Sequence, residues 1–129
     1  MKSYCVALLL LLGCSAPQPY FDQNYELNSP MSATVGSIML TEATGYQNAG
    51  KVTSRYSKDL IYDGLAGNII KITYEETANG YTTPGSQREF QYDLSKSKII
   101  TWGDMKIEVL DANNERIRYQ VLEVGHGKH

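Results

Sequence analysis

The sequence predicts an all-β fold: a single small antiparallel sandwich or barrel of about six to seven strands. Three observations lead to this prediction. Apolar and polar residues alternate with a period of two in several short segments between Gly36 and Val124. These segments recur about every ten residues, with turn-forming residues between them. No stretch combines a helical period with capping residues at its ends.

The chain begins with a segment that is typical of bacterial export signals. Lys2 precedes an unbroken apolar run from Val6 to Leu12, and Leu11-Leu12-Gly13-Cys14 has the form of a lipobox. The run is shorter than the roughly twenty apolar residues that span a bilayer. It has the length of a secretory h-region, about 7–15 residues. We therefore expect residues 1–13 to be a lipoprotein signal peptide and Cys14 to be the lipidated N-terminus.

Two other interpretations of this segment stay open. An ordinary signal peptide cut after Ala16 would fit the small residues Cys14-Ser15-Ala16, although Pro17 directly after the cut is unfavourable. The remaining alternative is a buried strand or helix of a cytosolic protein.

The lipid would decide where the protein works. Each buried methylene contributes about 0.8 kcal/mol, so two acyl chains such as palmitate anchor a protein stably where one does not. Ser15 stands beside the anchor, where an Asp commonly retains such proteins in the inner membrane. We therefore expect an anchor in the outer membrane that faces the periplasm, or the outer face of the cell membrane in an organism without an outer membrane.

Residues 14–34 are expected to form the lipidated N-terminus and a flexible linker. Pro17, Pro19 and Pro30, with several Asn and Ser residues, interrupt any regular period. The segment also holds three aromatic residues, which are unusual for a spacer. They could pack on the domain, lie at the lipid interface or contact a partner: Tyr20, Phe21 and Tyr25.

The β domain is expected over residues 35–124. Short alternating or apolar segments predict its strands: Ile38–Thr41, Lys58–Asp63, Asn68–Glu76, Arg88–Leu94, Ile99–Trp102, Met105–Val109 and Arg116–Val121. Because side chains alternate between the faces of a strand, each segment has one core-facing set. We expect these residues to face the core together: Ile70, Ile72, Tyr74, Ile107, Val109, Tyr119 and Val121.

Turn-forming residues separate the strands. Gly64–Asn68 predicts a short hairpin loop, because glycine reaches the positive φ angles of such turns. Its glycines do not indicate a phosphate loop, since a strand and not a helix follows them. Asp111–Glu115 predicts a turn rich in Asn. Residues 125–129 are expected to be a flexible tail.

A similarity covers a little over half of the chain. It is carried by LIYDGLAGNIIKITYEE, with its Tyr-x-Gly-x-x-Gly-Asn-x-Ile hairpin, and by REFQYDLSKSKIITWGDMKIEVLDANNERIRYQVL, with its Tyr-Asp-Leu turn and Ile-Glu-Val-Leu-x-Ala-x-Asn hairpin. This part of the chain resembles uncharacterised bacterial outer-membrane lipoproteins with a small all-β domain. The resemblance implies the β fold and the anchor but no activity. The shared positions are of turn and core type: Gly64, Gly67, Asn68, Leu94, Asp111 and Asn114.

The charge balance of the sequence argues against nucleic acid as a partner. Twelve Lys and Arg stand against fourteen Asp and Glu, without the basic stripe that binds nucleic acid. The two cysteines, Cys5 and Cys14, would be lost to the signal and to the lipid. A domain of this size would then depend on its core alone, without the disulfides that many small exported domains use.

Catalysis is not expected. The two histidines, His126 and His129, lie in the predicted tail, where no general base can be held beside a nucleophile. A rigid metal site needs three or four oriented ligands, so we expect neither metal nor cofactor. Asp63 and Glu75 could lie near each other across the first hairpin. That pair leaves a carboxylate-based glycan hydrolase as a distant alternative.

Binding is the class of function that the sequence favours. Tyr81 lies in the predicted loop Asn79–Ser86, and Tyr, Arg and Trp are the residue types that anchor interfaces. We expect Tyr81, Arg88 and Trp102 to form a contact site for an envelope protein or polymer, or to support an envelope assembly. The alternative is a periplasmic inhibitor of a hydrolase such as lysozyme, which would present the Asn79–Ser86 loop to the enzyme's cleft.

Overall fold

The structure is a computed structural model that describes residues 16–124, so Cys14, the expected signal peptide and both histidines lie outside the described residues. Within that range the chain is all-β, as predicted, and contains no helix. The strands are β1 (Gln18–Gln23), β2 (Met31–Thr34), β3 (Ile38–Asn48), β4 (Lys51–Ala66), β5 (Ile69–Ala78), β6 (Tyr81–Thr82), β7 (Arg88–Asp93), β8 (Ile99–Trp102), β9 (Met105–Ala112) and β10 (Arg116–Val124).

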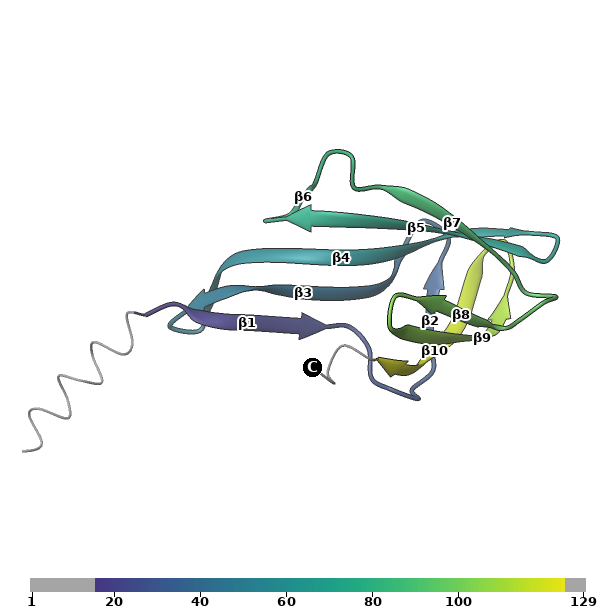
Figure 1. Ribbon diagram of the computed structural model, residues 1–129, viewed down its shortest axis with the longest axis horizontal. Helices are drawn as coiled ribbons and strands as arrows, with labels where there is room; N and C mark the ends of the chain where they lie inside the picture. The colour runs from purple at the N-terminus through teal and green to yellow at the C-terminus, as the bar shows by residue number, and fades with distance from the viewer. Residues whose placement is uncertain (1–15, 125–129) are drawn as a thin grey trace, which may run out of the picture.

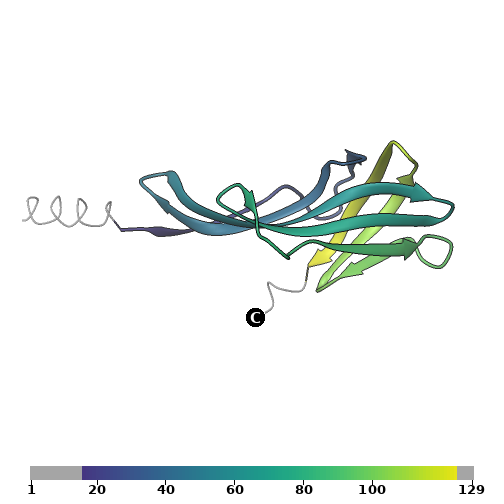
Figure 2. The ribbon, with the colours of Figure 1, turned by 90° about the horizontal axis from the view of Figure 1, so that it is seen from above.

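The strands form two antiparallel sheets. The long sheet has the order β1-β3-β4-β5-β6, with β7 also paired to β5, and the short sheet has the order β2-β10-β9-β8. Figures 1 and 2 show that the short sheet runs across one end of the long sheet. The predicted antiparallel sandwich is therefore confirmed. The strand number exceeds six to seven because β1, β2 and β6 fall in segments that the sequence predicted as linker or loop.

The segment predicted as a flexible linker, residues 14–34, belongs to both sheets from Gln18 onward. All six residues of β1 pair with β3, and β2 pairs with β10. Pro19 is compatible with this pairing because β1 is an edge strand, where a missing N–H is tolerated. Between these strands Tyr25 is buried in the core, and the amide of Asn28 donates to the carbonyl of Val121 at 2.7 Å. The linker prediction is therefore corrected for this part of the chain.

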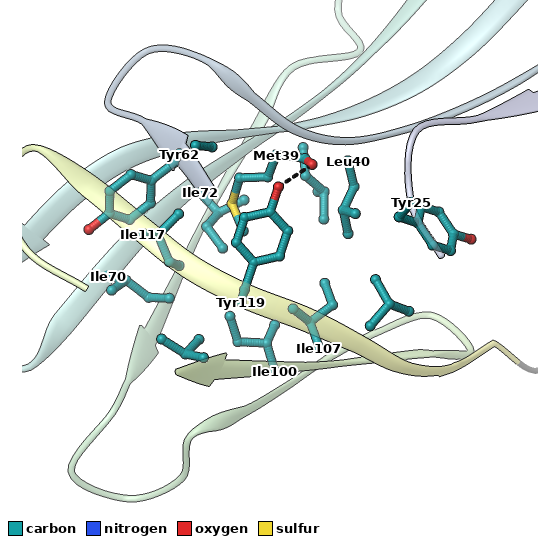
Figure 3. Packing of buried hydrophobic residues seen from close by; sticks show 14 of the residues in the cluster. Tyr25, Met39, Leu40, Tyr62, Ile70, Ile72, Ile100, Ile107, Ile117 and Tyr119 are labelled. Atoms are coloured by element: carbon teal, nitrogen blue, oxygen red, sulfur yellow. Dashed lines mark hydrogen bonds between the residues drawn. The ribbon is translucent and has the colours of Figure 1, made fainter. Parts of the chain in front are cut away.

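The core fills the space between the two sheets. The predicted core residues are buried, except Tyr74, which is half-buried and packs against the cluster. Figure 3 shows the Tyr119 hydroxyl reaching across from the short sheet to the carbonyl of Met39 in the long sheet, to which it donates a hydrogen bond. The Tyr62 hydroxyl crosses the other way and donates to the Asn113 carbonyl at 2.6 Å. Both phenols are thus buried without losing a hydrogen-bond partner.

The β4–β5 hairpin turns at Gly67-Asn68, which is shorter than the predicted Gly64–Asn68 loop. Gly67 has φ 61°, as expected in a tight hairpin turn. Gly64 lies within β4 instead, where a register shift follows Tyr62 and φ is 119°. Side chains other than glycine rarely adopt that φ, so backbone geometry requires glycine at position 64.

Candidate functional site

The long sheet extends well beyond the short sheet. β4 has 16 residues and β10 has 9, which correspond to roughly 50 Å and 30 Å at the usual rise per residue. Among residues 16–124, no second layer covers β1 and the adjoining parts of β3, β4, β5 and β6 (Figures 1 and 2). We call the face of the long sheet that packs on the short sheet the inner face. Its uncovered part is the open face, on which Phe21, Tyr46, Tyr56 and Tyr81 are exposed.

Alternation along β4 links the core to the open face. Leu60 is buried under the short sheet, Lys58 is exposed, and Tyr56 is 51% exposed. These residues share one face because alternate residues of a strand point the same way. The inner face therefore changes from apolar core to a charged zone and then to an aromatic zone.

The strand register aligns the aromatic side chains in a row. Phe21 pairs with Thr44, Thr44 with Tyr56, Tyr56 with Ala78, and Ala78 with Tyr81. Directly opposite residues share a face. The two outer rings, Phe21 and Tyr81, are 56% and 80% exposed. We call these five residues the aromatic row.

Tyr46 lies on the same face, two residues beyond Thr44, and is 53% exposed. The backbone beside it is crowded: a Cβ on Gly45 would lie 2.0 Å from the carbonyl oxygen of Ser54. Only glycine fits at that position of β3. β3 and β4 are therefore closely packed at the residue directly before Tyr46.

A charged row lies between the aromatic row and the core. Gln23 pairs with Glu42, Glu42 with Lys58, and Lys58 with Glu76. Two phenols at the edge of the core orient the carboxylates. The Tyr25 hydroxyl donates to Glu42 Oε2 at 2.6 Å, and the Tyr74 hydroxyl donates to Glu76 Oε2 at 2.5 Å.

The raised pKa values of these two phenols keep their hydroxyls protonated, so that both remain hydrogen-bond donors. Burial raises the pKa of Tyr25, and the hydrogen bond to Glu42 raises it further. Burial and then the hydrogen bond to Glu76 raise the pKa of Tyr74 in the same way. Both groups stay protonated at neutral pH, so each fixes one oxygen of its carboxylate. The other oxygen of each carboxylate is oriented with it.

A cleft opens where the short sheet ends above the charged row. Its volume is about 360 Å³, and its wall includes the β8–β9 turn. Trp102 packs against Tyr74 in this wall, with ring centroids 5.3 Å apart and an interplanar angle of 52°. Aromatic pairs prefer such tilted arrangements. The lining residues are Glu42, Lys58, Tyr74, Trp102, Gly103, Asp104 and Met105.

The structure places the three predicted binding residues in two groups. Arg88 pairs with Tyr74 across β7 and β5, and Trp102 packs on the Tyr74 ring, so these two lie at the inner end of the open face. Tyr81 pairs with Ala78, four residues further along β5. That distance is roughly 13 Å along a strand. Tyr81 is exposed as predicted, but it lies in β6 and not in an irregular loop.

The loop that follows β6 is fixed to the sheet. Ser86 is buried; its Oγ donates to the Thr83 carbonyl at 2.7 Å and accepts from the Glu76 amide at 3.1 Å. The Thr83 amide donates to the Glu76 carbonyl at 2.8 Å. The remaining residues of this loop rise from the edge of the long sheet (Figure 1).

The carboxylates singled out for catalysis are not paired as expected. Glu75 pairs with Asp59, while Asp63 accepts a hydrogen bond from the Thr73 hydroxyl. Asp59 is buried on the outer face, and its two oxygens accept from Thr41 Oγ1 at 2.9 Å and Ser57 Oγ at 3.2 Å. Both oxygens are thus satisfied within the sheet. Residues 16–124 hold no group of three or more His, Cys, Asp or Glu that is placed to bind a metal ion.

No family model, curated protein or solved structure matches this chain. The resemblance to envelope lipoproteins therefore stays a prediction from the sequence. The described part of the chain has no helix with the length and hydrophobicity that crossing a membrane requires. The open face, with its aromatic row and charged row, is the feature of the described residues on which a function can be based.

Proposed function

We propose that this protein is a non-catalytic, lipid-anchored envelope protein that binds an envelope polymer or protein on the open face of its β domain. The observation that carries the proposal is the aromatic row, which crosses the full width of the long sheet in solvent. Exposed aromatic side chains that gather in one place are typical of interaction sites.

The backbone of the open face supports this proposal. Its four exposed aromatic residues lie on paired strands, so binding would cost less ordering entropy than it would on mobile loops. The neighbouring Glu42 and Glu76 are already oriented by the phenols of Tyr25 and Tyr74. A ligand would therefore meet rings and hydrogen-bond acceptors in fixed positions.

Two adjacent residues of β1 provide a matched test. Phe21 pairs with Thr44 on the open face, and Tyr20 pairs with Gly45 on the outer face. We expect Phe21→Ala and Tyr56→Ala to lose capture of the partner from crosslinked envelopes, while Tyr20→Ala keeps it. Thermal unfolding of each variant checks that the domain is folded. Full capture by folded Phe21→Ala and Tyr56→Ala variants would remove the open face from the proposal.

A specific observation also supports the second candidate, a hydrolase inhibitor. The loop after β6 projects from the sheet edge and is held by the hydrogen bonds of Ser86. Rigid projecting loops suit insertion into an enzyme's cleft because little freedom is lost on binding. The test is whether the protein inhibits lysozyme. Weaker inhibition by the Pro84→Ala variant, together with unchanged inhibition by the Tyr56→Ala variant, would favour this function over the first.

A further inference from the structure

We infer that the open face binds a single chain of a β-1,4-linked glycan, laid across the strands along the aromatic row. This inference rests on the proposed function and names the chemistry of the partner. The first argument is spacing. Phe21, Tyr56 and Tyr81 stand on every second strand of the sheet, with the smaller Thr44 and Ala78 between them. Neighbouring strands are about 4.8 Å apart, so a ring recurs about every 10 Å.

An extended β-1,4-linked glycan repeats at nearly the same interval. One sugar advances the chain by slightly more than one strand spacing, and successive sugars are turned over. The same side of the sugar therefore returns at every second residue, as the rings do. Each pyranose has an apolar face of axial C–H bonds that packs on an aromatic ring. Thr44 and Ala78, being small, leave room for the sugars between the rings.

The charged row supplies the complementary polar contacts. It runs parallel to the aromatic row, two residues away along each strand, or roughly 7 Å. Sugar hydroxyls both donate and accept hydrogen bonds. Carboxylates such as Glu42 and Glu76 accept strong, charge-assisted hydrogen bonds from hydroxyls, and Lys58 donates. Gln23 Nε2 already donates to the Tyr25 carbonyl at 2.9 Å and has a second N–H to donate. The rings would thus contact the faces of the sugars while this row contacts their edges.

Charge argues against a lipid surface as the occupant. With Arg88 and Asp104 at its inner end, the charged row has three carboxylates against two cations. This is not the polybasic surface that binds anionic headgroups. The right-handed twist of the sheet also rotates each ring relative to the next. A single glycan chain can follow this twist, but a flat crystalline polymer surface cannot.

Oligosaccharides of defined linkage test the inference. The full-length chain in detergent would be titrated with cellohexaose and chitohexaose, with calorimetry as the readout. Maltohexaose is the matched control, because its α-linked chain curves and cannot keep the ring spacing. Three rings span about five sugars, so we expect hexamers to bind far more tightly than disaccharides. Tyr56→Ala should weaken binding about tenfold, equal to about 1.4 kcal/mol, and Tyr56→Phe should keep it.

Several outcomes would overturn the inference, each in a different way. Equal affinity for maltohexaose would reject the spacing argument, and equal losses in Tyr20→Ala and Tyr56→Ala would move the site off the open face. Stronger partition into anionic than into zwitterionic vesicles, with no oligosaccharide bound, would identify a lipid surface instead, because the acyl anchor by itself inserts into both. If no oligosaccharide binds while Phe21→Ala still loses envelope capture, the proposed function stands and its partner is a protein.

Discussion

Tyrosine has two structural roles in this molecule, and its place along a strand decides between them. Tyr62 and Tyr119 are buried between the sheets; the Tyr62 hydroxyl donates to the Asn113 carbonyl in the β9–β10 turn, and the Tyr119 hydroxyl donates to the Met39 carbonyl in β3. Beyond the short sheet, Tyr56 and Tyr81 expose their rings. The chain has ten Tyr and two Phe, and tyrosine suits both environments, since its hydroxyl can bond to water or to a buried acceptor.

Ile72 tests the contribution of the core at the scale of one residue. It is buried on β5 in the centre of the cluster. Ile72→Ala should lower the free energy of unfolding by about 2–5 kcal/mol, because the cavity adds to the lost burial. Tyr81→Ala, on the open face, should change it by less than about 0.5 kcal/mol. Urea unfolding measures both, and similar losses in the two variants would show that Tyr81 is structural.

The Tyr119 phenol should make stability depend on alkaline pH. Burial raises its pKa to about 12, against about 10 in an unfolded chain. Between these values the unfolded state releases its proton and the folded state keeps it. Stability that is fully present below pH 10 is therefore lost as the pH rises through 12.

Comparison with Tyr119→Phe isolates this effect from the other tyrosines. At neutral pH the variant should be less stable by about 1–3 kcal/mol, because the Met39 carbonyl loses its buried donor. The difference between the two proteins should narrow from pH 10 upward in urea unfolding. A difference that stays constant up to pH 12 would contradict the pKa assignment.

Most of the strands could be predicted from the sequence, because half-buried strands alternate. Alternating or apolar segments predicted β5, β7, β8, β9 and β10, and the parts of β3 and β4 at Ile38–Thr41 and Lys58–Asp63. β1 was missed because Pro19 and the neighbouring Asn residues suggest irregular backbone, whereas an edge strand tolerates proline. β2 was missed because Pro30 and Ser32 suggest irregular backbone, and because its four residues include one large apolar side chain, that of Met31.

The candidate site was less predictable than the fold. Tyr81, Arg88 and Trp102 were selected by residue type and position, and all three line the open face or its inner end. Tyr56 was missed, although the signal was present: it continues the series Leu60, Lys58 along one face of β4. Alternation cannot show where a facing sheet stops. Exposure of Tyr56 depends on the length of the short sheet, which tertiary packing sets.

Ser86 provides a test at the scale of one element. Ser86→Ala removes the acceptor of the Glu76 amide and the donor to the Thr83 carbonyl. We expect faster hydrogen exchange at residues 83–87 and at residue 76, with a loss of stability of about 1 kcal/mol. Ser97→Ala is the control, since Ser97 Oγ accepts from the Ile99 amide in a different turn. Unchanged exchange in Ser86→Ala would show that other contacts hold the loop.

Because the two sheets differ in length, one end of the molecule stabilises the fold and the other end exposes side chains to solvent. β3, β4 and β5 each run from the core at one end to the open face at the other. The core end buries its apolar side chains between two layers. The other end can therefore expose aromatic side chains without weakening the cluster on which folding depends.

Lipidation is tested at the scale of the whole protein. The lipobox Leu11-Leu12-Gly13-Cys14 predicts that Cys14 is acylated after cleavage. Cys14→Ala should block labelling with radioactive palmitate, leave the unprocessed precursor and abolish partition with membranes. Normal processing and labelling of this variant would refute the lipid anchor.

The early start of β1 limits how far an anchored domain could stand from its bilayer. Gln18, the first residue of β1, is four positions after Cys14. Four fully extended residues span at most about 14 Å. A linker that continued to Thr34 would let the domain move much further from the membrane. β1 enters the long sheet at its uncovered end, beside Gln47. With Cys14 acylated, the aromatic row would be held nearer the lipid headgroups than the core is. The open face would then stay close to the membrane surface, and a glycan strand would have to come equally close to that surface to be bound.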